Sequence, residues 1–132
     1  TVRSILDTAH HAGIPVVASS HNFQSTPTQE EILSILEKMD LMGADILKIA
    51  VMPQSRKDVV ALLSATEEMD CRTTRPLITM SMGPLGMISR LCGEVFGSSL
   101  TFGSVGKTSA PGQVSAKELA NVLKLIHESM GD

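Results

Sequence analysis

Apolar and polar positions along this chain alternate between two patterns. Short apolar runs that end in polar residues predict strands at 15–21, 45–53 and 76–83, with a weaker fourth strand at 100–104. Apolar residues at helical spacing predict a helix before the first run and one after each run. These helices are marked by residues 2–9, 26–39, 55–63, 88–95 and 115–126. Strands that alternate with helices imply a parallel α/β sheet covered by helices.

The order of these elements is that of repeated β/α units. No Gly-x-Gly-x-x-Gly or Walker loop follows any predicted strand, so an open nucleotide-binding sheet is disfavoured. The other architecture with this order is a (β/α)8 barrel of the TIM type, and four strands would supply half of it. Residues 1–132 are therefore expected to form half of a single barrel domain. The chain begins at Thr1 in the middle of a pattern, without Met or a signal peptide, which suggests a fragment or a processed piece.

Lys48 stands inside the second apolar run, where a charged side chain is unexpected. By the two-residue period of a strand, Lys48 points to the barrel interior if Leu47, Ile49 and Val51 point outward to the helices. An apolar interior disfavours the ammonium, and a neutral amine is a nucleophile that can form a Schiff base with a ketone. The alternative is that Lys48 lies near the strand end and extends its amine to water.

Polar residues gather at the carboxyl ends of the predicted strands, where barrels of this type place their active sites. His21 ends the first strand and could carry protons near neutral pH, although a structural hydrogen bond would also explain it. Arg90 follows the third strand and could hold a carboxylate through two parallel hydrogen bonds, or pair with Glu94 four residues on. The segment 104–113, rich in Gly, Ser and Pro, could be a lid over a substrate or a plain flexible loop.

Composition argues against several classes of function. The chain has 42% hydrophobic and 19% charged residues and a net charge of −3, which gives no reason to expect nucleic acid or an anionic membrane as a partner. Its apolar runs are strand-sized, so none is expected to span a bilayer. Cys71 and Cys92 lack metal-ligand spacing and are expected to be reduced, as in a cytoplasmic protein. No combination of His, Asp and Glu has ligand spacing either, so we expect no metal.

Five short motifs occur in order along the chain. They are Ser20-His21-Asn22-Phe23; Asp45-Ile46-Leu47-Lys48-Ile49-Ala50 with Met52-Pro53; Thr79-Met80-Ser81-Met82-Gly83 with Ile88-Ser89-Arg90; Phe102-Gly103; and Ser109-Ala110-Pro111-Gly112-Gln113. Together they resemble the motifs of type I 3-dehydroquinate dehydratase, and the resemblance covers nearly the whole chain. Asn22 departs from the family pattern, which often has Asp after the catalytic His; the change should leave the imidazole in place.

The resemblance implies a (β/α)8 barrel, of which this chain supplies about the last four β/α units, and a lyase of the shikimate pathway. Such a lyase dehydrates 3-dehydroquinate to 3-dehydroshikimate. Lys48 matches the family's Schiff-base lysine, His21 its acid/base histidine, and Arg90 the arginine that binds the substrate carboxylate. The further matches are two lid residues and two pocket-wall residues: Ser109, Gln113, Met80 and Phe102. The implied chemistry needs no cofactor.

Family members carry a complete barrel, so the resemblance implies that residues 1–132 are its carboxyl-terminal half. Exposed edges of a half-barrel must be covered. We therefore expect another segment or chain to supply the missing half, or the chain to self-associate as a homodimer. Two alternatives stay open. One is a class I aldolase-type lyase, which also uses a strand lysine, and the other is an inactive half-barrel that needs a complementing amino-terminal half.

Overall fold

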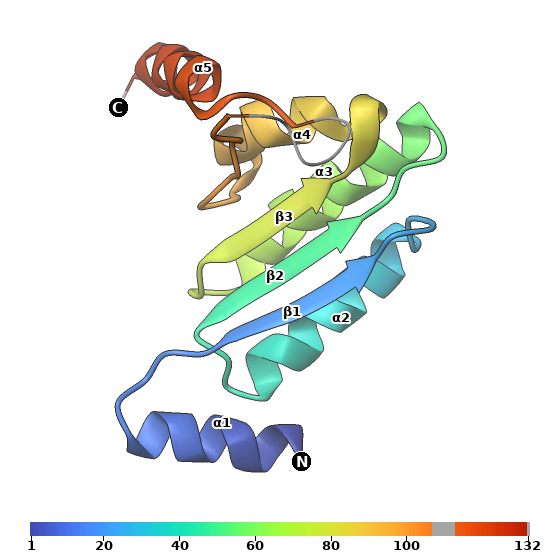
Figure 1. Cartoon of the computed structure of the whole chain (residues 1–132). Coiled ribbons are helices and arrows are strands. Elements are labelled where there is room, and N and C mark those ends of the chain that lie inside the picture. The colour runs from blue at the N-terminus through green and yellow to red at the C-terminus, as the bar shows by residue number, and fades with distance from the viewer. Residues whose placement is uncertain (107–112, 132) are drawn as a thin grey trace.

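The computed structural model describes residues 1–106 and 113–131. Helices and strands alternate along this part of the chain, which confirms the predicted α/β order (Figure 1). The elements are α1 Val2–His11, β1 Val17–Asn22, α2 Gln29–Leu41, β2 Ile46–Val51, α3 Arg56–Arg72, β3 Leu77–Ser81, α4 Gly83–Phe96 and α5 Ala116–Ser129. None of the helices in these residues is both long and apolar enough to cross a membrane.

Local signals explain where several helices begin and end. The Thr28 hydroxyl accepts a hydrogen bond from the Glu31 N–H at 3.2 Å, and the Ser115 hydroxyl accepts one from the Glu118 N–H at 3.3 Å. Each bond satisfies an N–H group that the first turn of the helix leaves open. Gly97 ends α4 in the left-handed conformation that favours glycine.

The three strands form one parallel sheet in the order β1-β2-β3. Helices α2 and α3 cover one face of this sheet, α4 packs on β3 beside α3, and α5 packs on α4 (Figure 1). Helix α1 lies beyond the amino ends of the strands. No helix in the described part of the chain covers the other face of the sheet, which is called the open face below.

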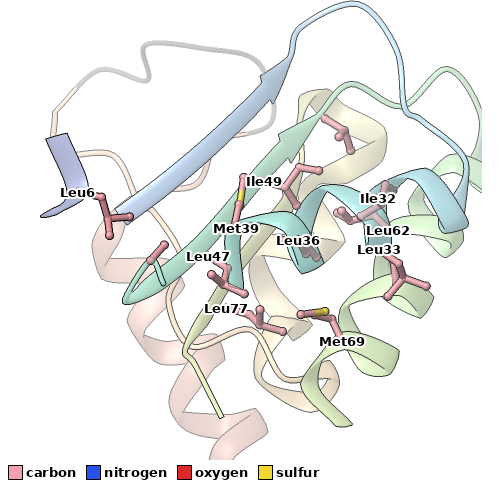
Figure 2. Close-up of a cluster of buried hydrophobic side chains, with 13 residues drawn as sticks. Leu6, Ile32, Leu33, Leu36, Met39, Leu47, Ile49, Leu62, Met69 and Leu77 are labelled. Carbon is pink, nitrogen blue, oxygen red and sulfur yellow. The ribbon is translucent and has the colours of Figure 1, made fainter. Parts of the chain in front are cut away.

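The main hydrophobic core lies between the sheet and helices α2 and α3 (Figure 2). Leu47, Ile49 and Val51 of β2 all point into it, as the two-residue period predicts. They pack against fully buried side chains of the two helices, among them Ile32, Leu36, Leu62 and Met69. Burying one such side chain contributes about 1.5–3 kcal/mol. This layer therefore holds the strands in register.

The open face of the sheet carries a second, smaller apolar cluster. Ala50, Ile78 and Met80 are buried there, with Ile46 and Met82 packed against them. The β1 residues on the same face are exposed: Val17, Ser19 and His21. In a closed barrel this face would line the interior. The candidate catalytic residues Lys48 and His21 lie on this face.

The predicted fourth strand at 100–104 is wrong, because this segment forms only one isolated bridge, between Ser104 and Ser115. Its neighbour would be the outer edge of β3, but serine hydroxyls already occupy that edge. The Thr79 N–H donates to Ser98 Oγ at 3.1 Å, and the Ser81 N–H donates to Ser89 Oγ at 2.9 Å. With these two backbone donors satisfied by side chains, residues 100–104 form no ladder with β3.

Helix α4 buries small residues and one arginine rather than its apolar stripe. Its buried positions are Gly83, Gly86, Ser89, Arg90 and Gly93. Several of its large apolar residues are exposed instead: Leu85, Met87, Ile88 and Val95. A Cβ added at Gly86 would lie 2.1 Å from the carbonyl oxygen of Ser81. Only glycine permits the helix backbone to approach the end of β3 this closely.

Candidate active site

The strand register places Lys48 and His21 on the same open face of the sheet. Lys48 pairs with Ser19, and His21 pairs with Ala50, which lies two residues beyond Lys48 on β2. Paired residues of parallel strands point to the same face, so the Cα atoms of Lys48 and His21 are about 8 Å apart, one strand spacing across and two residues along. Because the lysine side chain is long and flexible, its amine and the imidazole can both reach one small molecule.

Lys48 is half-buried, and its Nζ lies 4.8 Å from the centroid of the Phe102 ring. At this distance the negative face of the ring attracts a cation and orients the amine. Phe102 is itself 40% exposed. The amine therefore rests against an aromatic side chain at the open face. Within the described residues it neither extends freely into water nor lies in a closed pocket.

Met80 continues the open face onto β3. It pairs with Ala50 and is buried in the small cluster with Ile78. His21, Ala50 and Met80 thus form one row across the three strands, and Lys48 lies in the row two residues earlier. The arrangement puts an amine and an imidazole on an apolar floor, which is a suitable surface for binding a small organic molecule.

His21 is exposed at the carboxyl end of β1 and stacks on Phe23, with ring centroids 5.7 Å apart and an interplanar angle of 11°. The stacking supports the imidazole where the strand ends. Asn22 forms the turn that follows: its Oδ1 accepts hydrogen bonds from the N–H groups of Gln24 at 3.0 Å and Ser25 at 2.9 Å. An Asp carboxylate could accept the same two bonds, so Asn22 preserves the turn.

Arg90 is only 6% exposed on α4, and its Nε has no hydrogen-bond partner within the described residues. Removal from water lowers the pKa of its guanidinium. The ion pair with Glu94 that the sequence left open is not formed, because Glu94 binds His127 of α5 instead. Arg90 lines a hollow of about 470 Å³ beside α4, together with Thr101 and the carboxylate of Glu94 that binds His127. A buried cation of this kind gains from any anion that enters the hollow.

The predicted lid falls mostly outside the described residues, and Ser109 lies there. Gln113 is described: it is half-buried and stands three residues before the start of α5. The closing of this segment over a substrate therefore stays a prediction.

Sequence reasoning assigns no specific role to two buried hydroxyls, although Ser81 lies in one of the five motifs. The Oγ of Ser81 and the Oγ1 of Thr101 have no hydrogen-bond partner in the described part of the chain. It also missed Ser89, which binds the end of β3. The spacing of Gly86, Ser89 and Gly93 along one side of α4 could have indicated this contact, because small residues on one helix face permit close approach to a strand.

Comparison with known proteins gives one consistent result. The family model that matches is type I 3-dehydroquinase, over residues 1–130. The 3-dehydroquinate dehydratase of Clostridioides difficile (strain 630) is 53% identical over 130 residues, which cover 98% of this chain and 51% of that protein. The 3-dehydroquinate dehydratase of Syntrophotalea carbinolica is 56% identical over 127 residues, which cover 96% of this chain and 50% of that protein.

Solved structures agree with the sequence relatives. A crystal structure of type I 3-dehydroquinate dehydratase from Clostridium difficile with covalently modified comenic acid matches with a TM-score of 0.93 at 53% identity, over 97% of this chain and 51% of that one. The enzyme from Geobacillus kaustophilus matches with a TM-score of 0.92 at 40% identity, over 96% and 49%.

The predicted barrel fold is confirmed by these neighbours, which are TIM-type barrels, and this chain spans about half of their length. The chain belongs to the type I 3-dehydroquinase family.

Proposed function

We propose that this chain supplies the catalytic groups of a 3-dehydroquinate dehydratase, which removes water from 3-dehydroquinate to give 3-dehydroshikimate in the shikimate pathway. The observation that carries the proposal is the arrangement on the open face: Lys48 and His21 lie on neighbouring strands, and Phe102 orients the amine. Membership of the family over residues 1–130 supports it further.

In the proposed reaction, the amine of Lys48 loses its proton and attacks the C3 ketone, and loss of one water gives an iminium. The iminium withdraws electrons, so the adjacent C2–H becomes acidic and His21 takes that proton, which leaves an enamine. The enamine electrons expel the C1 hydroxyl, and His21 returns its proton so that the hydroxyl leaves as water. A second water then hydrolyses the iminium and frees Lys48. The net change is the loss of one water, and no cofactor is required.

The other residues hold the substrate in place. Arg90 would bind the substrate carboxylate, which can accept a hydrogen bond from the buried Nε that has no partner within the described residues. Met80 and Phe102 would form walls of the pocket. Ser109 and Gln113 would close over the bound substrate as lid residues and keep water from the intermediates.

The open face needs a cover before it becomes a pocket. We infer that the missing β/α units come from another segment of the same protein or from another chain, and that the assembled enzyme is a homodimer. Large apolar side chains are exposed on α1 and α4, which supports the proposal that further segments pack against these helices. They are Val2, Ile5, Leu85 and Ile88. Both cysteines are free thiols, Cys71 and Cys92. That state fits a reducing cytoplasm, where we place the enzyme.

The test is the mass of the protein after incubation with 3-dehydroquinate and borohydride, which reduces a Schiff base to a stable amine. Two samples should be compared: this chain alone, and the chain fused to the part of the Clostridioides difficile relative that it does not match, here called the completed enzyme. An adduct on Lys48 is expected in the completed enzyme. Lys48→Met is the matched control, because it keeps a side chain of similar length without the amine. An adduct that persists in Lys48→Met would refute the assignment.

The same samples separate the alternatives. His21→Ala should let the Schiff base form but slow proton transfer, so the trapped adduct should persist while turnover falls; normal turnover would exclude an acid/base role for His21. A borohydride adduct formed with a ketone substrate of class I aldolases, in place of 3-dehydroquinate, would favour the aldolase-type lyase. Activity that appears only in the completed enzyme would identify the 132 residues as a half that needs its complement.

A further inference from the structure

A single buried hydroxyl joins the helix that carries Arg90 to the sheet. Ser89 is 2% exposed on α4, and its Oγ accepts a hydrogen bond from the Ser81 N–H at 2.9 Å. The same hydroxyl donates to the Gly86 carbonyl oxygen at 2.7 Å. Ser81 is the last residue of β3. Ser89 therefore connects the carboxyl end of the sheet to the first turns of α4.

This contact leaves little freedom for the helix to move. The Gly86 backbone lies so near Ser81 that an added Cβ would meet the Ser81 carbonyl oxygen at 2.1 Å. Ser81 is fully buried, so without the Ser89 hydroxyl its N–H would lack an acceptor in a place that water does not reach. The N–H could recover a partner only if α4 shifted or water entered. The Ser89 hydroxyl thus sets the position of α4 against β3.

Arg90 directly follows Ser89, so a shift of this turn carries the guanidinium with it. The Nε of Arg90 has no hydrogen-bond partner within the described residues, so no bond at this atom holds the guanidinium in place. We propose that Ser89 is a positioning residue for carboxylate recognition: its bond to Ser81 holds Arg90 where the substrate carboxylate arrives. This inference rests on the proposed function of the site.

The test is steady-state kinetics of the completed enzyme with 3-dehydroquinate. Ser89→Ala should raise KM about tenfold and leave kcat within about twofold, because a carboxylate contact is made in the ground state and the transition state alike. Thr66→Val is the matched control. It removes another fully buried hydroxyl that bonds to β3, through Thr79 Oγ1 at 2.7 Å, but on the side of α3. It should lower the stability and leave KM unchanged.

A double variant decides whether Ser89 acts through Arg90. Adding Ser89→Ala to Arg90→Ala should cause no further rise in KM, since the group being positioned is already absent. A tenfold rise that persists in the Arg90→Ala background would overturn the inference, and so would an unchanged KM in Ser89→Ala alone. If Ser89→Ala does not fold, Ser89→Cys replaces it. Its thiol is a weaker acceptor, so a smaller rise in KM is expected, and no rise would refute the role.

The trapping experiment separates failure of this inference from failure of the proposed function. An intact borohydride adduct on Lys48 with an unchanged KM in Ser89→Ala would remove only the role of Ser89. Absence of the adduct in the unsubstituted completed enzyme would overturn the proposed function and this inference together.

Discussion

Replacing Gly86 with alanine should destabilise the protein, although alanine is the better helix former. The new methyl group would lie 2.1 Å from the carbonyl oxygen of Ser81 and 2.3 Å from its carbonyl carbon. Ordinary contacts between carbon and oxygen are about 3.3–3.6 Å, so α4 must move away from β3 by roughly 1 Å. Such a movement stretches the 2.9 Å bond from the Ser81 N–H to Ser89 Oγ beyond hydrogen-bond range.

The magnitude follows from three opposing contributions. Alanine gains about 1 kcal/mol over glycine in a helix. Over-packing costs about 1–3 kcal/mol, and a buried N–H that loses its acceptor costs about 1–3 kcal/mol more. The losses exceed the gain, so we expect the free energy of unfolding to fall by about 3 kcal/mol.

Urea unfolding followed by circular dichroism measures this change, and Gly93→Ala in the same helix is the matched control. Its Cβ would lie 3.1 Å from the Cβ of Ser98, a side-chain atom that can shift by a few tenths of an ångström. The gain in helix propensity is the same, so the free energy of unfolding should change by less than about 1 kcal/mol. Equal losses in Gly86→Ala and Gly93→Ala would refute the argument from close approach.

Three further predictions follow from burial and charge. Leu36→Ala, at a fully buried position, should lower the free energy of unfolding by about 2–5 kcal/mol. Leu41→Ala, at a position that is 84% exposed, should change it by less than about 0.5 kcal/mol in the same urea assay. The hydrogen bond with Glu94 raises the pKa of His127 above its ordinary value of 6.5. The bond therefore stabilises the fold fully below about pH 6.5, and this contribution is lost as the pH rises through the raised pKa. His127→Gln should abolish this part of the pH dependence of the free energy of unfolding, and an unchanged pH dependence in the variant would contradict the prediction. Arg90→Lys should raise KM in the completed enzyme, because an ammonium cannot form the two parallel bonds of a guanidinium; an unchanged KM would remove Arg90 from carboxylate binding.

The sheet could be predicted from the sequence because its strands follow a strict physical rule. A period of two residues sends Leu47, Ile49 and Val51 to one face and Lys48 to the other, whatever the surroundings. The same periodic reasoning locates α4 but does not identify its buried side. Apolar spacing marks a helix, whereas the face that packs is set by how closely a neighbour approaches, and here the end of β3 approaches at Gly86.

The residues 100–104 show another limit of local pattern. Leu100 and Phe102 alternate with small or polar residues, as is typical of a short strand. A strand also needs a free sheet edge with which to pair. Ser89 and Ser98 occupy that edge of β3. Tertiary packing places these two serines there, and the sequence of residues 100–104 does not indicate it. The candidate site was more accessible to sequence reasoning. Its motifs place Lys48 and His21 on one face, while the contact of Phe102 with the amine depends on a loop conformation that no spacing encodes.

The serine hydroxyls along β3 make the two borders of the sheet unequal. An additional strand that pairs with β3 would first have to displace the hydroxyls of Ser98 and Ser89 from the backbone N–H groups of β3. The border at β1 presents no such competitor within residues 1–106 and 113–131. We therefore expect complementing strands to dock alongside Val17–Asn22 first, and the strand that closes the barrel to pair with β3 only after these hydroxyls are displaced.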